Sequence, residues 1–174
     1  MRLDVGCGSH RDGDVGMDQF PSPGATVVHD ILDLPWPFPD ATFDSVVAHQ
    51  VLEHLPAGGD ATGKDHIFRV CDEAWRVLKP GGTLEIDVPH LSGRTAFRDF
   101  THRRFFVPMT FSHLWDGQRD PWYPRKIWRL EYCHVLQEVP YQYHMRKYLP
   151  KLTGVLEWLP ISRPHNIFVK LQKV

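Results

Sequence analysis

The stretch Leu3-Asp4-Val5-Gly6-Cys7-Gly8 decides the fold, because a short apolar strand runs directly into a Gly-x-Gly turn. Three more short strands follow it, and the first two end in Asp18 and Asp30. In an open parallel sheet the carboxyl ends of the strands lie together, and ligands bind beside them. The pattern therefore predicts an α/β protein with a Rossmann-like, doubly wound, mostly parallel sheet.

The rest of the chain alternates predicted helices with predicted strands. Residues 62–78 place apolar side chains at spacings of three and four, which is typical of an amphipathic helix. Thr62 and Asp65 resemble a capping box at its start, and the proline and glycines of residues 79–82 end it. Residues 91–125 lack a clear period and are predicted to form an insertion over the site. The other predicted elements are strands at 15–17, 25–29, 43–48, 83–88, 126–135 and 166–173, a helical turn at 51–55 and a helix between 142 and 159.

The composition is that of a globular protein. Of the 174 residues 42% are hydrophobic and 24% are charged, which excludes a disordered or fibrous chain. No apolar run approaches the roughly 20 residues that cross a bilayer, and the first residues enter a strand without a signal peptide. Cys7, Cys71 and Cys133 are odd in number and far apart, which is typical of reduced thiols. We expect one cytoplasmic domain over residues 1–174.

The charges are divided unevenly along the chain. Residues 1–90 carry 6 basic and 15 acidic side chains, a net charge of −9, whereas residues 91–174 carry 14 basic and 6 acidic ones, a net charge of +8. An acidic half suits a cationic ligand, and a basic half suits an anionic one. We expect residues 1–90 to bind a cofactor and residues 91–174 to complete the sheet and supply most of an acceptor site. Solvated charges that hold the halves together are the alternative.

The strand ends carry groups that suit a nucleoside with a sulfonium tail. Asp18 is placed to accept hydrogen bonds from ribose hydroxyls, and Asp30 from an adenine amino group. Ile31 is placed to pack the ring and to donate its backbone N–H. Asp4 is placed to hold the glycine loop or, through water, the ligand's ammonium group. The full predicted cofactor set is Asp4, Gly6, Cys7, Gly8, Asp18, Gln19, Asp30, Ile31 and His49.

A dinucleotide is the main rival ligand. The third glycine of G-x-G-x-x-G would fall at Arg11, so that fingerprint is broken. About ten residues separate Gly8 from Asp18, which leaves little room for a helix that would support a pyrophosphate. A nicotinamide-dependent oxidoreductase is therefore disfavoured.

Three stretches resemble motifs of class I methyltransferases. Residues 3–8 resemble their motif I, residues 43–55 (FDSVVAHQVLEHL) their fourth-strand motif, and residues 76–82 (RVLKPGG) the run before their fifth strand. The resemblance implies a seven-stranded sheet with an antiparallel last strand, S-adenosylmethionine as cofactor and S-adenosylhomocysteine as product. We expect the segment that precedes motif I in larger members to be absent and the first helix to be nearly lost. We therefore expect a site that is partly open until residues 91–125 close over it.

Histidines near the strand ends are the candidates for acid–base chemistry. Methyl transfer is a displacement at a sulfonium carbon, so the protein mainly positions the acceptor, and a base is needed only for a protonated acceptor. His54, His90 and His102 are the predicted catalytic residues, with Asp99 placed to orient His102. A role in shaping the pocket is the alternative for each. Asp99, His90 and His102 could also bind a metal, but without a ligand-spacing signature we predict none.

The sequence limits the class of acceptor. It contains no Asp/Asn-Pro-Pro-Tyr motif and no Pro-Cys nucleophile motif, and a net charge of −1 argues against a nucleic-acid partner. We expect a small-molecule acceptor, including glycan and natural-product intermediates, with an oxygen or nitrogen nucleophile. An anionic acceptor suits the arginines in the stretch from residue 94 to 104. The alternative function is a cofactor-binding partner or regulatory subunit without activity of its own.

Overall fold

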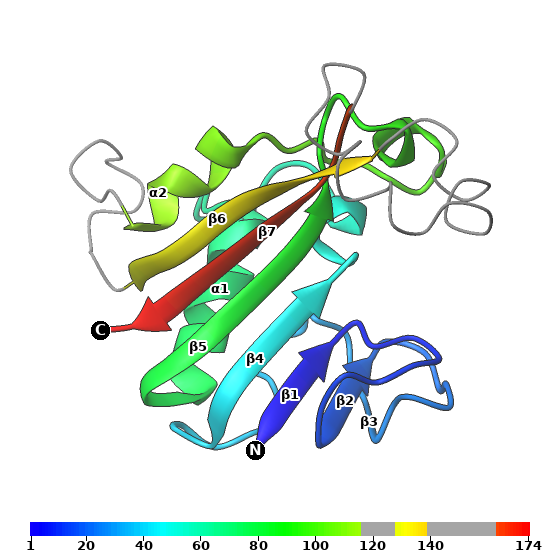
Figure 1. Ribbon diagram of the computed structural model, residues 1–174. Helices are drawn as coiled ribbons and strands as arrows, with labels where there is room; N and C mark the ends of the chain where they lie inside the picture. Colours follow the sequence, from blue (N-terminus) through cyan, green and yellow to red (C-terminus); the bar gives the residue numbers. More distant parts are fainter. Residues whose placement is uncertain (116–127, 139–162) are drawn as a thin grey trace, which may run out of the picture.

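A computed structural model describes residues 1–115, 128–138 and 163–174 of the chain. Within these ranges seven strands form one sheet in the order β3-β2-β1-β4-β5-β7-β6 (Figure 1). Strands β1 to β5 pair in parallel, and β7 is antiparallel to both β5 and β6. The predicted mostly parallel sheet with an antiparallel last strand is confirmed. The strands are β1 (Arg2–Val5), β2 (Val15–Asp18), β3 (Val27–Val28), β4 (Phe43–His49), β5 (Leu78–Pro89), β6 (Trp128–Glu138) and β7 (Arg163–Lys173).

The strand order reverses between β1 and β4. From β1 the chain steps outward through β2 and β3, then returns to the other side of β1 at β4 and continues through β5. The connections that leave neighbouring parallel strands at such a switch point run in opposite directions and leave a crevice outside the carboxyl ends of the strands. The C-terminal ends of β1 and β4 therefore border the predicted ligand position.

Buried apolar residues hold the centre of the sheet together. Val46 and Val47, neighbours on β4, are both fully buried, so both faces of the strand are covered. In the antiparallel pair, Ile86 of β5 lies opposite Val169 of β7, and both side chains are buried.

Helix α1 (His66–Val77) packs beside the sheet and follows the predicted period, with a buried stripe that includes Val70, Cys71, Ala74 and Val77. The predicted capping box is wrong, because Asp65 is itself the N-cap. Its side chain accepts a hydrogen bond from the amide of Ile67 at 2.8 Å, whereas the Thr62 hydroxyl donates to Asp60.

The connection from β1 to β2 contains turns instead of a helix, so the expected loss of the first helix is confirmed. Buried Asp4 replaces part of its support: its carboxylate accepts a hydrogen bond from the amide of Asp12 at 2.7 Å. The predicted turn after β4 is the 3₁₀ helix η1 (Leu52–His54).

The described part of the predicted insertion consists of short helices: η2 (Arg94–Phe97), η3 (Pro108–Phe111) and α2 (Ser112–Trp115). A parallel bridge between His90 and Phe106 ties this segment to the end of β5. Residues 116–125 and the predicted helix between 142 and 159 lie outside the described residues. None of the described helices has the length and apolar character needed to cross a membrane. All three cysteines are free.

A buried carboxylate joins the proline-rich loop before β4 to α1. Glu73 on α1 accepts a hydrogen bond from the backbone amide of buried Trp36 at 2.7 Å, and also two from Arg76. Arg76 in turn donates to the carbonyl groups of Trp36 and Phe38 and to the exposed carboxylate of Asp40. Glu73 is thus the central acceptor of a hydrogen-bond network that holds the proline-rich loop against α1.

Replacing Glu73 by alanine should lower the free energy of unfolding by about 3 kcal/mol, because it leaves a buried amide and a guanidinium without their acceptor. Asp40→Ala is the matched control, since its carboxylate is 79% exposed and should contribute less than about 1 kcal/mol. Urea denaturation followed by circular dichroism measures both. Equal losses in the two variants would contradict the central place of Glu73.

Candidate functional site

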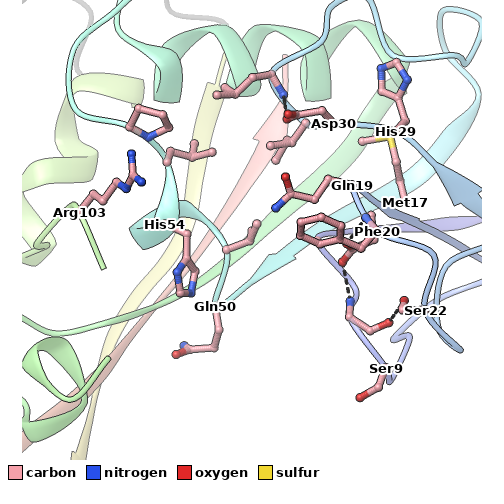
Figure 2. A pocket seen from close by; sticks show the side chains of 18 residues that line it. Ser9, Met17, Gln19, Phe20, Ser22, His29, Asp30, Gln50, His54 and Arg103 are labelled. Atoms are coloured by element: carbon pink, nitrogen blue, oxygen red, sulfur yellow. Dashed lines mark hydrogen bonds between the residues drawn. The ribbon is translucent and has the colours of Figure 1, made fainter. Parts of the chain in front are cut away.

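A cavity of about 560 Å³ lies at the switch point of the sheet (Figure 2). Its walls come from the segments that follow β1, β2, β3 and β4, as expected for the carboxyl ends of parallel strands. Residues of the predicted cofactor set on its wall are Gly6, Gly8, Asp18, Gln19, Asp30 and Ile31. The wall also includes Ser9, Met17, Phe20, Ser22, His29, Leu32, Gln50, Val51, His54, Leu55, Pro56 and Arg103.

The glycine turn after β1 has a backbone shape that favours glycine. Gly6 and Gly8 have φ angles of +69° and +54°, in the left-handed region. A Cβ at Gly6 would lie 2.4 Å from Cγ2 of Val51, so the turn and the start of the segment after β4 pack directly together. A Cβ at Gly8 would meet nothing within 4 Å, so the backbone there borders open space.

Asp18 fixes the glycine turn as well as facing the cavity. One carboxylate oxygen accepts the amide of Gly8 and the other the amide of Phe20, each at 2.9 Å. Each carboxylate oxygen has a second lone pair, so the side chain can still accept hydroxyl protons of a ligand. Asp30 has a similar arrangement, because one of its oxygens accepts the amide of Leu32 at 2.9 Å.

Three residues of the predicted cofactor set do not line this cavity. Asp4 holds the Asp12 amide, which is the first of the two roles predicted for it, and burial raises the pKa of its carboxyl. Cys7 is buried beside Gly16. His49 lies with Nδ1 3.9 Å from the Asp12 carboxylate. Asp4 and His49 thus lie next to Asp12 in the connection from β1 to β2, and Cys7 is part of that connection.

Gln50 is a site residue that the sequence analysis missed. It is one of two non-glycine residues in the described chain with a positive φ, at +52°, and its amide donates to the carbonyl of Asp87 at 2.8 Å. Strained backbone of this kind is frequent at functional sites. Its position directly after the fourth strand is the only sequence signal that could have indicated it.

A second hollow of about 340 Å³ shares Gln50 with the first cavity. Most of its wall comes from the segment after β5, through Thr95, Arg98, Asp99, Phe100 and His102. The predicted insertion therefore supplies the wall of a hollow next to the main cavity.

His54 and His102 lie side by side between the two hollows. Their ring centroids are 4.8 Å apart, and His54 lines the first cavity whereas His102 lines the second. His54 Nδ1 lies 2.8 Å from the Thr101 hydroxyl, which donates its proton to the Asp99 carboxylate at 2.7 Å. Because that hydroxyl proton is used, His54 Nδ1 must be the donor to Thr101. The uncharged ring of His54 is thus left with an acceptor at Nε2.

The Nδ1 atom of His102 is also a donor, because it lies 3.0 Å from the carbonyl oxygen of Ala96, which can only accept. Burial, followed by the neighbouring His102, lowers the pKa of His54, which favours its uncharged form. Of the three predicted catalytic histidines, the structure brings these two together.

His90 lies apart from this pair. Its Nδ1 pairs with the hydroxyl of Ser92 at 2.9 Å, and the ring lines neither hollow. Among the predicted arginines, Arg103 borders the first cavity and Arg98 the second. Arg104 instead holds the chain together, with an ion pair to Asp65 at 3.0 Å.

Glu53, which the sequence analysis did not single out, is the buried acid of this region. Its side chain is 1% exposed, and neither carboxylate oxygen has a hydrogen-bond partner in the described part of the chain. Burial raises the pKa of Glu53 to about 7, and the negative charges of Asp87 and Asp99 act in the same direction. Ligand atoms of Glu53, His54 and His102 lie within 4.8 Å of one another, so the three could hold a metal ion.

Comparisons with known proteins agree with the fold. Residues 14–86 match the family model described as a methyltransferase domain. The match covers the segments after β2, β3 and β4 that form most of the main cavity. No curated protein sequence matches the chain significantly.

Solved structures share the fold at low sequence identity, and each alignment covers 99% of this chain. A Bacillus halodurans protein is 18% identical with a TM-score of 0.62, over 91% of its length. A methyltransferase dependent on S-adenosylmethionine from Archaeoglobus fulgidus is 17% identical with a TM-score of 0.60, over 85%. The N-methyltransferase NodS of Bradyrhizobium japonicum, solved with S-adenosylhomocysteine, is 14% identical with a TM-score of 0.57, over 76%.

The raised pKa of Glu53 predicts a pH-dependent stability. Below about pH 4.5 the carboxyl is neutral in folded and unfolded chains, so its burial carries no charge penalty. As the pH rises from about 4.5 to about 7, the unfolded chain releases the proton first, and the folded state loses about 3 kcal/mol relative to Glu53→Gln. Urea denaturation of both proteins across this range, with a metal chelator present, measures the difference. A constant difference between parent and variant would contradict the assignment.

Proposed function

We propose that this chain is a class I S-adenosylmethionine-dependent methyltransferase, supported by the family match and the shared fold, and that it transfers the methyl group to an oxygen or nitrogen nucleophile of a small molecule. The observation that carries the proposal is the adjacency of the two hollows, with Gln50 in the wall of both. We assign the main cavity to the methyl donor and the second hollow to the acceptor.

The main cavity fits the donor in size and in chemistry. Its volume of about 560 Å³ is in the usual range for small-molecule sites. The glycine turn at Gly6 and Gly8 lets backbone approach the amino-acid tail of the donor, and Asp18 and Asp30 offer carboxylate acceptors to ribose and adenine. The net charge of −9 over residues 1–90 favours a cationic sulfonium.

S-adenosylmethionine supplies an activated methyl group when bound, so the protein's contribution is placement and the exclusion of water. The turn Leu52–His54 begins at the wall of the donor cavity and brings His54 toward the acceptor hollow. Of the predicted catalytic set, we retain His54 and His102 as the groups that meet the acceptor. His90 has no contact with either hollow that would give it that role.

The acceptor hollow suits a small, anionic molecule. Its volume of about 340 Å³ admits a metabolite or one sugar unit, and the exposed Arg98 offers a guanidinium to a carboxylate or phosphate. Phe100, whose side chain is fully exposed beside Arg98, offers a ring face for stacking. These groups support a small-molecule acceptor better than a nucleic acid.

Asp18→Ala and Asp30→Ala should each weaken binding of S-adenosylhomocysteine about tenfold or more, because each removes a charged acceptor worth about 1.5 kcal/mol or more. Asp40→Ala, which removes an exposed carboxylate outside the cavity, is the control and should leave the affinity unchanged. Isothermal titration calorimetry measures the dissociation constants. Parent-like affinity in both cavity variants would refute the assigned ribose and adenine positions.

The acceptor class is tested with S-adenosylmethionine carrying a labelled methyl group, incubated with the enzyme and separated fractions of a cell extract. We expect label in a small-molecule fraction, and the same extract fractions incubated without the enzyme are the negative control. Label confined to nucleic acid or protein would overturn the proposal. Tight donor binding without label in any fraction would support a non-catalytic binding subunit instead.

A further inference from the structure

We propose that Glu53, His54 and His102 bind a divalent transition-metal ion at the junction of the donor cavity and the acceptor hollow. The three side chains offer one carboxylate and two imidazoles, and their ligand atoms lie within 4.8 Å of one another. Two histidines and one glutamate form a known zinc ligand set, in which a further position stays open for water or substrate. With ligand bonds of about 2 Å, ligand atoms on one ion lie about 3 to 4 Å apart, so small side-chain movements close the set.

The hydrogen bonds of the two imidazoles match those of metal ligands. A histidine that binds a metal through one ring nitrogen usually donates its other N–H to a carbonyl, a carboxylate or water, which fixes the ring. His102 donates from Nδ1 to the Ala96 carbonyl, and His54 donates from Nδ1 to Thr101, whose hydroxyl is held by Asp99. Each ring is therefore oriented with Nε2 left as a lone-pair donor to a cation.

The buried carboxylate of Glu53 is an independent observation. A carboxylate removed from water and left without partners is costly, yet both Glu53 oxygens are buried and without a hydrogen-bond partner among the described residues. The charged groups that act on it are the carboxylates of Asp87 and Asp99, which have the same sign of charge. A cation held jointly with the histidines would supply the missing partner.

The ligands come from two segments that are already locked together. The backbone carbonyl of Glu53 accepts hydrogen bonds from the amides of Arg103 and Arg104, at 2.7 and 3.1 Å. These bonds hold the turn after β4 against the segment after β5. His54 and Glu53 lie on the first segment and His102 on the second. The site is therefore built into the fold rather than formed by loose surface groups.

Resting on the proposed function, this inference narrows the acceptor to a hydroxyl. A cation at this position would take the acceptor oxygen at its open position and lower its pKa. The acceptor releases its proton to solvent, the oxygen lone pair forms the bond to the methyl carbon, and the sulfur keeps the electron pair of the bond that breaks. The products are a methyl ether and S-adenosylhomocysteine.

The test begins with protein stripped by a chelator and titrated with Zn²⁺, and separately with Co²⁺, whose absorption spectrum reports imidazole and carboxylate ligands. We expect one ion per chain, and at least a tenfold loss of affinity in Glu53→Gln and in His102→Gln. His134→Gln, which changes an exposed histidine on β6, is the matched control and should bind as the parent does. Circular dichroism verifies that each variant is folded.

Failure of this inference can be separated from failure of the proposed function. If the parent binds no metal, the proposed site is refuted. If folded His102→Gln binds the metal as tightly as the parent does, the binding is that of an adventitious ion only, and the proposed site is refuted as well. If stripped protein methylates its acceptor at an undiminished rate, the inference also fails while the proposed function stands. The metal site and the proposed function are both supported if stripped protein still binds S-adenosylhomocysteine but loses methyl transfer, and if Zn²⁺ restores the transfer. If stripped and metal-loaded protein both fail to bind S-adenosylhomocysteine, the proposed function itself fails.

Discussion

The reversal of strand order between β1 and β4 is the constraint on which the rest of the structure depends. Both strands are buried in the centre of a parallel sheet, so their backbone hydrogen bonds and apolar side chains fix where they end. The chain leaves both strands at the same edge of the sheet, and the segments that follow β1 and β4 meet there with those that follow β2 and β3 to form the wall of the main cavity. The site is therefore a consequence of topology first and of particular side chains second.

The short connections make the polar residues serve two purposes. A longer protein of this fold can support its glycine turn with a helix, whereas here the loop between β1 and β2 is held by carboxylates. Asp4 holds it from behind through the Asp12 amide, and Asp18 holds it from the ligand side through the Gly8 amide. The proposed function couples ligand affinity to loop order at Asp18, because the carboxylate that we assign to the ribose also accepts the Gly8 amide.

The sequence predicted the strands and the strand-end carboxylates because those signals are local. A run of β-branched residues followed by glycine or aspartate can be recognised from adjacent residues alone. Contacts between distant parts of the chain are not needed to predict it. Thr62 was wrongly assigned to the helix start because two overlapping Asx-type patterns, at Asp60 and Asp65, compete in that stretch. The burial of Glu53 could not be predicted from sequence, since a segment from far along the chain packs against its turn, where the amides of residues 103 and 104 donate to the Glu53 carbonyl.

The same docking joins the cavity that we assign to the donor to the hollow that we assign to the acceptor. Val51 packs against the glycine turn of the donor cavity, and two residues later the Glu53 carbonyl receives the segment that carries His102. A shift of that segment would move His102 relative to His54 and also displace the turn that borders the donor. Because well-packed segments do not deform continuously, the acceptor side is expected to assemble in one step with the wall of the donor cavity. The turn from residue 50 to 55 therefore contacts both the glycine turn of the main cavity and the segment that carries His102.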